Sequence, residues 1–421
     1  MEYKKLQTDL VIIGDGVAAL ALAYLAAQRE IRTVILGKGL PGTTHSATGL
    51  IAPRPDYLIS DEELVQRTAF ECSRWVKLFY PQILKPQRFL IPIGPELPYS
   101  VRTFRSLLKR YDEIAKIRLT GLGNHFIISQ THLEKMEPNF RKNNINGAIA
   151  FGEWTVDPAV LLKKLGWETS IYTDFVKRFK INDFKEFKIH GGLIEEVIAL
   201  DATGNMVIKI SNDRGPLVVV NATGPWIKDV CARLGICIDY QLKTGVQLEI
   251  PGWYFQSGVV TFGSDGKYLV CLQKKGVLQV GPTNSDLSGH PDSFTPSDKE
   301  TEYLTTALRN ILEDKRLPPH SFLKHGFRVK ATAVDTNRPV IWNHSKAGLS
   351  NMYSLHPGKI SLALLAGDEM LDKVISDGWL AKPRIFMGNP ICLDGCQKFR
   401  NEIKLLFLKI QSLFHLVYKT P

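Results

Sequence analysis

Long apolar runs are absent from this 421-residue chain. No stretch of 18 or more apolar residues is available to cross a bilayer, so the sequence predicts no transmembrane segment. Cysteine is scarce, and no secretory signal precedes the six scattered residues at positions 72, 231, 237, 271, 392 and 396. This usage argues against a disulfide framework and favours a reducing, cytoplasmic location. Cys392 and Cys396 form a CxxxC pair without a second pair of ligands, so no metal site is predicted.

Acidic residues are outnumbered, 42 against 53 lysines and arginines, which gives a formal net charge of +11. An excess of this sign suits small anionic partners. Zinc-finger spacing and RNA-binding sheet motifs are absent, so we expect no nucleic acid. Low-complexity stretches and internal repeats are also absent. With 44% hydrophobic and 23% charged residues, the chain is expected to be globular and long enough for two or three domains.

The clearest motif lies in the first forty residues. Residues 9–13 (DLVII) are a short apolar run typical of a buried parallel strand, and GDGVAA follows at 14–19. A helix is predicted over 17–28 and a second strand over 33–36. Strand, glycine turn, helix and strand together give the GxGxxA form of the dinucleotide-binding fingerprint.

Each small residue of this fingerprint has a physical reason. Gly14 permits the tight turn, Gly16 lets the backbone approach a pyrophosphate, and Ala19 lets the helix pack closely on the strand. The amino end of the helix then presents free amides and partial positive charge to the phosphates.

One part of the fingerprint is missing. An Asp or Glu normally follows the second strand and accepts hydrogen bonds from the ribose, but Gly37 and Lys38 stand there. The lost bond would cost about 1.5–3 kcal/mol, which weakens binding without abolishing it. Restoring the acid by Gly37→Glu is therefore expected to tighten binding if the backbone still reaches the ribose. Lys38 would contact the cofactor or, alternatively, favour a phosphorylated ribose.

Four later blocks extend the pattern. PGTTHSATGLIAPRP (41–55) is hydroxyl-rich, with a surface linker as the simpler interpretation; LVVVNATGPWIKDV (217–230) indicates strand, glycine turn and helix. GFRVKATAVDTNRPVI (326–341) and NMYSLHPGKISLALLAGDEMLDKV (351–374) complete the set. With the fingerprint, these blocks resemble the FAD-dependent oxidoreductases of the D-amino-acid-oxidase superfamily over about residues 8–375. NATGPW, GFR and PGK are most similar to the flavin-dependent glycerol-3-phosphate dehydrogenases, and GTTHSATGL also to the dimethylglycine and sarcosine dehydrogenase branch.

The resemblance implies an α/β fold with a Rossmann-like FAD-binding domain and an inserted α+β substrate domain that contains an antiparallel sheet. The FAD-binding part would use residues 8–80, 145–225 and 325–375, and the substrate part 81–144 and 226–324. The strand-like runs YLVCLQ and VLQVGPTN suit the inserted sheet. In WTVDPAVLLKKL, Asp157 is expected to cap a helix whose first turn contains Pro158.

The resemblance also implies the residues that hold FAD without a covalent bond. Val197 enters through GGLIEEV (191–197), which is similar to the strand whose valine backbone holds the adenine. His45 lies one position from where some relatives attach flavin covalently, a less favoured alternative. The expected cofactor-binding residues are Gly14, Gly16, Ala19, Lys38, Thr44, Ser46, Gly49, Val197, Thr223, Gly224, Gly358 and Lys359.

In such enzymes a hydride passes from a substrate carbon to the flavin, while the protein supplies orientation and charge. Arg328 would clamp a substrate anion, or alternatively form a structural salt bridge. Lys359 would stabilise negative charge, or alternatively remain solvated. Arg54 would replace a missing phosphate contact, and His356 is the candidate base. Arg338, which precedes Pro339, is interpreted as structural.

Departures from the family pattern leave three functions open. Ala52 and Gln247 stand at or near positions where the glycerol-3-phosphate dehydrogenases carry histidine, and Gly37 replaces the acid. The favoured function is a dehydrogenase of a small anionic alcohol such as glycerol 3-phosphate. The alternatives are an amine or amino-acid oxidase or dehydrogenase, and a degenerate FAD-binding scaffold.

The final residues, 376–421, are expected to form a helical tail. Within NEIKLLFLKIQSLFHLVYKTP, apolar residues from Ile403 to Val417 follow helical spacing, with lysines around them. Such a helix would lie on a membrane surface and bring the enzyme to quinone, or would pack on its own domain or a partner. The location is therefore expected to be cytoplasmic, with peripheral membrane attachment under the first alternative.

Overall fold

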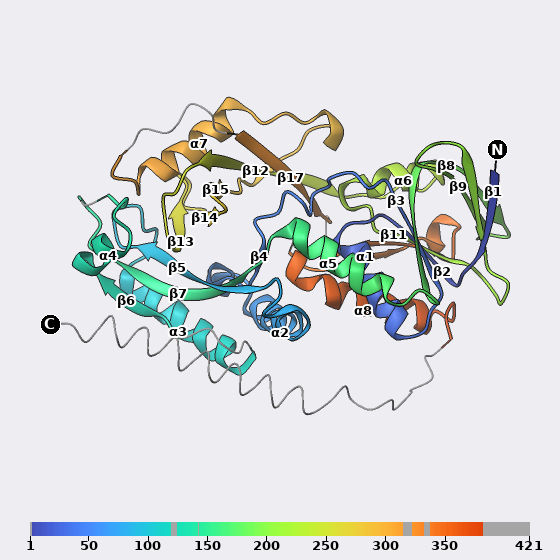
Figure 1. Ribbon diagram of the computed structural model, residues 1–421, viewed down its shortest axis with the longest axis horizontal. Helices are drawn as coiled ribbons and strands as arrows, with labels where there is room; N and C mark the ends of the chain where they lie inside the picture. The colour runs from blue at the N-terminus through green and yellow to red at the C-terminus, as the bar shows by residue number, and fades with distance from the viewer. Residues whose placement is uncertain (1, 119–123, 142, 315–321, 332–336, 382–421) are drawn as a thin grey trace.

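The computed structural model describes residues 2–118, 124–141, 143–314, 322–331 and 337–381. The two predictions that concern later positions, the amphipathic tail and the CxxxC pair, lie outside the described residues. The described residues form a mixed α/β fold with two large sheets side by side, one around the N-terminus and one at the other end of the molecule (Figure 1).

The first sheet has a parallel centre, as expected of a Rossmann-like domain. Its five central strands, β8, β3, β2, β11 and β19, run parallel. The strands in spatial order are β1 (Glu2–Gln7), β10 (Met206–Ser211), β9 (Leu193–Asp201), β8 (Val176–His190), β3 (Thr33–Gly37), β2 (Leu10–Ile13), β11 (Val218–Asn221), β19 (Met352–His356) and β18 (Val340–Asn343).

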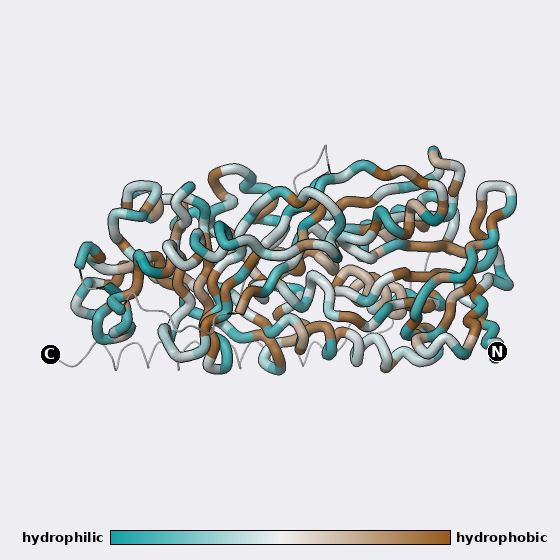
Figure 2. The backbone as a smooth tube through the Cα atoms, turned by 90° about the horizontal axis from the view of Figure 1, so that it is seen from above, coloured by the Kyte–Doolittle hydropathy of each residue, from teal (hydrophilic) through white to brown (hydrophobic). Residues whose placement is uncertain are grey.

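The apolar runs of the central strands are buried on both faces. In β2, Leu10 and Ile12 pack into one core cluster, while Val11 and Ile13 pack into another on the opposite face. The first face is covered by α1 (Val17–Gln28), which packs against α5 (Pro158–Ser170) and α8 (Ala363–Ser376). The short helix α6 (Ile227–Arg233) contributes to the cluster on the other face. Hydrophobic residues accordingly concentrate in the interior strands (Figure 2).

The second sheet is mainly antiparallel. Its main path is β16 (Ser285–Asp286), β12 (Gln241–Pro251), β15 (Val277–Gly281), β14 (Tyr268–Lys274), β13 (Gly258–Phe262), β5 (Lys85–Pro92), β7 (Gly147–Thr155) and β4 (Leu50–Ile51). In addition, β17 (Phe322–Lys330) pairs with β12, and β6 (Phe126–Ser129) with β7. Helix α7 (Asp298–Arg309) covers one face and α3 (Val101–Arg118) the other, with α2 (Glu62–Phe79) and α4 (Gln130–Met136) nearby (Figure 1).

The sheets divide the chain differently from the expected segments. Strand β7 and residues 325–330 of β17 fall in ranges expected to build the FAD-binding part, yet both strands pair within the second sheet. The two-residue strand β4, from the hydroxyl-rich segment, joins that sheet as well. An apolar run shows that a strand is buried but does not reveal its pairing partner, so these memberships could not be predicted from the pattern.

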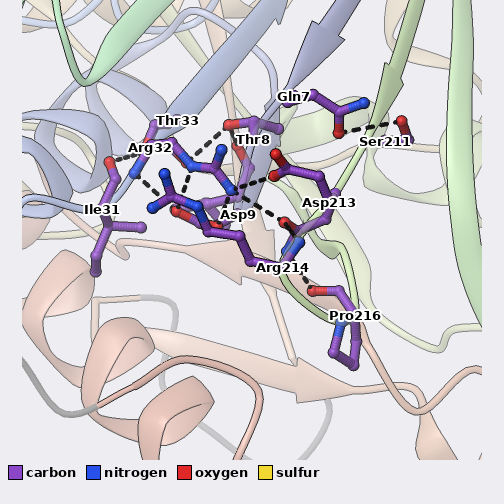
Figure 3. Close-up of polar contacts among 12 residues, drawn as sticks. Gln7, Thr8, Asp9, Ile31, Arg32, Thr33, Ser211, Asp213, Arg214 and Pro216 are labelled. Atoms are coloured by element: carbon purple, nitrogen blue, oxygen red, sulfur yellow. Dashed lines mark hydrogen bonds and ion pairs between the residues drawn. The ribbon is translucent and has the colours of Figure 1, made fainter.

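An ionic cluster joins the amino ends of β2 and β3, remote from the glycine turn (Figure 3). Arg32 pairs with Asp9 through Nη2–Oδ1 at 2.7 Å and Nε–Oδ2 at 3.0 Å. The same guanidinium reaches Asp213 Oδ1 at 2.9 Å in the turn before β11. Thr8 Oγ1 donates to the Arg32 carbonyl at 2.7 Å. Hydrogen bonding to Asp9 raises the pKa of Arg32 above its usual value, so the cation persists at any physiological pH.

Candidate functional site: a dinucleotide-sized cavity between two sheets

A cavity of about 820 Å³ lies where the carboxyl ends of the parallel strands meet the second sheet. Such volumes lie in the upper part of the range of about 300–1,000 Å³ typical of ligand pockets. Residues from both sheets line it, from Ile13 at the end of β2 to Ser361 before α8. In open α/β sheets this crevice is the usual ligand site.

The glycine turn after β2 has the close approach that its sequence predicts. Gly14 has a φ of +121°, and a Cβ there would lie 2.6 Å from the carbonyl oxygen of Ala222. Gly16 faces Thr44, whose Oγ1 accepts from the amide of Val17 at 3.3 Å. The amino end of α1 therefore faces the cavity with its backbone uncovered by side chains of its own.

The end of β3 differs from a standard fingerprint. Lys38 and Gly37 line the cavity, and the side chain of Asp15 lies against Gly37. Asp15 Oδ2 accepts from the amide of Gly39 at 2.8 Å. A carboxylate is thus present beside the strand end, although it comes from the glycine turn.

The hydroxyl-rich segment at 41–55 is not a surface linker. Its residues Thr44, Ser46 and Gly49, together with His45, line the cavity. The Thr43 side chain accepts from the amide of Phe327 at 3.4 Å, so the segment packs against β17 of the second sheet.

Two predicted cofactor residues do not line the cavity. Ala19 is fully buried in α1, where its small size serves helix packing. Val197 lies in β9, in the core cluster on the far face, and pairs with Ile210. The strand that neighbours β3 is β8, and its Ile181 lines the cavity instead. Gly191 and Gly192 form the turn between β8 and β9. The motif GGLIEEV therefore identified β9, the strand of this hairpin that is farther from β3.

Arg328 on β17 lines the cavity and has no carboxylate partner among the described residues. Its Nη1 donates to Asn284 Oδ1 at 2.9 Å, and its Nη2 lies 3.5 Å from the carbonyl oxygen of Thr283. Within the described ranges no Asp or Glu forms an ion pair with it. Burial lowers the pKa of Arg328 from its usual value, with the neighbouring Arg54 adding to this, but the group stays protonated at neutral pH.

Arg54 is held more firmly. Its Nη2 and Nε bind the Asp56 carboxylate at 2.8 and 3.1 Å. Its guanidinium lies 4.8 Å from the ring centroid of Tyr57 and 4.7 Å from that of Tyr268. The backbone at Arg54 has a φ of +69°, an uncommon conformation for a side chain of this size. A substrate anion at Arg54 would therefore share this cation with Asp56.

Lys359 follows the turn at Gly358, whose φ of +71° suits glycine. The Lys359 ammonium is buried 4.1 Å from the ring centroid of Tyr57, with no hydrogen-bond partner among the described residues. Burial, then repulsion from Arg54, lowers the pKa of Lys359 to about 7. The alternative of a solvated lysine is thereby excluded.

His356, the candidate base, also lines the cavity. Both of its ring nitrogens are buried and lack a partner in the described part of the chain. Burial lowers the pKa of His356 to about 4, so the imidazole is neutral at pH 7. It can accept a hydrogen bond or a proton there, but it is a weak base.

Behind the cations lies a buried carboxyl that the sequence did not indicate. Glu153 on β7 accepts from the Tyr111 hydroxyl at 2.7 Å, and burial raises the pKa of Glu153 to about 8. The sequence alone did not mark Glu153 as a site residue. A glutamate within an apolar strand indicates a buried carboxyl only once both faces of that strand are known to be buried.

Comparisons with known proteins decide the family. Residues 9–372 match the FAD-dependent oxidoreductase family known as DAO. The chain belongs to this family. It is therefore an FAD-dependent oxidoreductase, and the residues around the cavity fit that cofactor, because the Gly14 and Gly16 turn gives backbone access at a helix amino end.

Individual relatives of this flavoprotein are distant. Glycerol-3-phosphate dehydrogenase from Synechocystis sp. is 22% identical over 397 residues, covering 89% of this chain and 71% of the relative. For the first three curated relatives, the chain spans 51% to 71% of their length.

The fold is shared with solved flavoproteins. Glycerol-3-phosphate dehydrogenase from Bacillus halodurans, complexed with FAD, superposes with a TM-score of 0.66 at 19% identity, covering 94% of this chain and 71% of that one. Glycine oxidase from Geobacillus kaustophilus gives 0.62 at 16% identity, covering 88% and 95%. These likenesses confirm the predicted fold class and leave the substrate open.

Two of the departures noted in the sequence, Gln247 and Ala52, leave uncharged side chains at the cavity of this flavoprotein. Gln247 lines the cavity, donates to Thr48 Oγ1 at 3.2 Å and accepts from Gln279. The Ala52 amide donates to Ser361 Oγ at 3.2 Å. No titratable side chain stands at either position, so the geometry does not select a general base there.

Two features are absent from the described part of the flavoprotein. None of its helices is both long and apolar enough to cross a membrane. No group of three or more His, Cys, Asp or Glu residues in these ranges is arranged to hold a metal ion.

Proposed function

We propose that this flavoprotein oxidises a small anionic alcohol of the class of glycerol 3-phosphate. The observation that carries the proposal is the cavity-lining Arg328, which binds only neutral groups among the described residues. Its planar fork matches a phosphate or carboxylate. The other two arginines that line the cavity in the described ranges, Arg54 and Arg233, are already paired with Asp56 and Asp183.

In this proposal some residues bind the substrate and others supply positive charge. Arg328 orients the substrate anion, and Lys359 contributes positive charge from a buried ammonium group. Arg54, fixed by Asp56 and two aromatic rings, adds to the positive potential. FAD, when bound, would supply the electron-accepting chemistry that the oxidation of the substrate carbon requires. His356 is the neutral group available to accept a proton.

The second candidate is oxidation of an amine or amino acid, whose carboxylate would suit Arg328 equally well. Anaerobic mixing of the purified flavoprotein with a panel of compounds distinguishes the two. We expect glycerol 3-phosphate to bleach the flavin absorbance, and glycerol, which lacks the anion, to fail. Bleaching by glycine or proline, with none by hydroxy-phosphates, would replace the proposal with the second candidate.

We also propose a peripheral membrane location, with electrons passed to quinone, on the strength of the amphipathic spacing from Ile403 to Val417. Binding to vesicles should increase with anionic lipid and decrease with salt, because screening weakens the lysine contribution. Truncation after Pro390 should leave a yellow protein that no longer sediments with vesicles. Loss of FAD on truncation would instead show that the tail belongs to the fold.

A further inference from the structure

Asp15 occupies the space that a side chain at position 37 would need. A Cβ built on Gly37 would lie 2.5 Å from Asp15 Cβ and Cγ, and 2.6 Å from its Oδ2. Real Cβ atoms essentially never come within 3.0 Å of such neighbours. The glycine at the end of β3 and the aspartate in the glycine turn are therefore one joint arrangement.

The Asp15 carboxylate is held from one side only. Oδ2 accepts from the Gly39 amide at 2.8 Å and lies 3.6 Å from Arg178 Nη2. Oδ1 accepts no hydrogen bond from any described residue, and Asp15 lines the cavity. One oxygen is thus anchored to the chain, while the other remains available to a ligand.

This place in the fold has a defined chemical neighbour. In dinucleotide-binding folds the carboxylate at the end of the second strand accepts from ribose hydroxyls. Asp15 brings a carboxylate to the same strand end from the other side. We propose that Asp15 binds the adenosine ribose of FAD in place of the acid that is absent from position 37. The proposal rests on FAD as the cofactor and is independent of the substrate.

One consequence reverses the expectation from the sequence. Gly37→Glu alone should weaken FAD binding, because the new side chain would collide with Asp15 and place two carboxylates together. Moving the acid, by combining Asp15→Gly with Gly37→Glu, should recover binding. The alternative role for Asp15 is only to fix the loop through Gly39, and in that case the combined variant gains nothing.

The test is titration of apoprotein with FAD, followed by flavin fluorescence. Asp15→Asn keeps an acceptor for Gly39 but loses the charge, and we expect an increase in Kd of about 10-fold or more. Gly37→Glu should weaken binding comparably, and the double variant should return to within a few-fold of the parent. Asp201→Asn is the matched control: Asp201 also accepts a turn amide, from Met206 at 2.9 Å, but lies outside the cavity, so its Kd should be unchanged.

An FAD analogue with 2′-deoxyadenosine identifies the contact itself. The parent protein should bind the analogue more weakly than FAD, and Asp15→Asn should largely lose that discrimination. Thermal unfolding of each apoprotein separates altered folding from altered binding. Unchanged affinity of Asp15→Asn, or discrimination as large as in the parent, overturns the proposal. Failure of the parent to bind FAD would refute the cofactor instead, which keeps the two outcomes separate.

Discussion

Replacing Arg328 with lysine should separate substrate recognition from cofactor binding. The substitution keeps one positive charge but removes the fork that donates to Asn284 and faces the Thr283 carbonyl. A hydrogen bond to a charged partner contributes about 1.5–3 kcal/mol. Loss of one such bond to a substrate anion therefore lowers kcat/KM about 10- to 150-fold, at 1.4 kcal/mol per factor of ten.

The assay is reduction of the flavin under anaerobic conditions, with substrate concentration varied. FAD affinity should stay within about twofold, because the expected loss lies in the substrate contact. Arg338→Lys is the matched control. Arg338 binds Asp61 through three nitrogen–oxygen contacts of 2.7, 2.8 and 3.1 Å and does not line the cavity, so the substitution should lower stability and leave kcat/KM unchanged. Equal kinetics for Arg328→Lys and the parent would refute the role of Arg328.

Three further predictions concern Lys359, the helix cap at Asp157 and the turn at Gly14. Burial lowers the pKa of Lys359 to about 7, so its cation is present below that pH and lost above it; the rate with an anionic substrate should fall above pH 7, and a profile unchanged in Lys359→Met would contradict this. Asp157 accepts from the amides of Ala159 and Val160, so Asp157→Ala should cost about 1 kcal/mol in urea unfolding, whereas no loss would show the cap to be dispensable. Gly14→Ala places a Cβ 2.6 Å from the Ala222 carbonyl at a φ of +121°, and should yield colourless protein; full flavin absorbance would show that the turn can shift.

Local signals in the sequence predicted local structure well. The turn at Gly14 and Gly16 followed by α1 was confirmed, as was the cap of α5 by Asp157 with Pro158 in its first turn. The sequence signals for these elements come from residues a few positions apart, although Gly14 also lies close to the distant Ala222. Capping, glycine turns and helical periodicity are therefore visible in one sequence.

Long-range pairing set the limit of prediction. Val197 was assigned to the cavity because GGLIEEV resembles the adenine-binding strand of the family, whereas β8, which pairs with β3, brings Ile181 to the cavity. Asp15 was overlooked as an ordinary residue between two glycines, since its contact with Gly37 crosses from one turn to another. The site roles of Arg328, Lys359 and the other candidates remain predictions, although most of them were brought together around one cavity.

The position of β19 in the first sheet has a consequence for synthesis of the chain. β19 lies beside β11, and the turn that follows it, at His356 to Ser361, lines the same cavity as the glycine turn near the N-terminus. At translation rates of about 5–20 residues per second, the ribosome needs roughly 20–70 s between these two segments. A nascent chain that stops before Met352 therefore displays the fingerprint without the wall opposite it. We therefore expect FAD to be captured only after residues 356–361 have been made, because part of the cavity lining is missing until then.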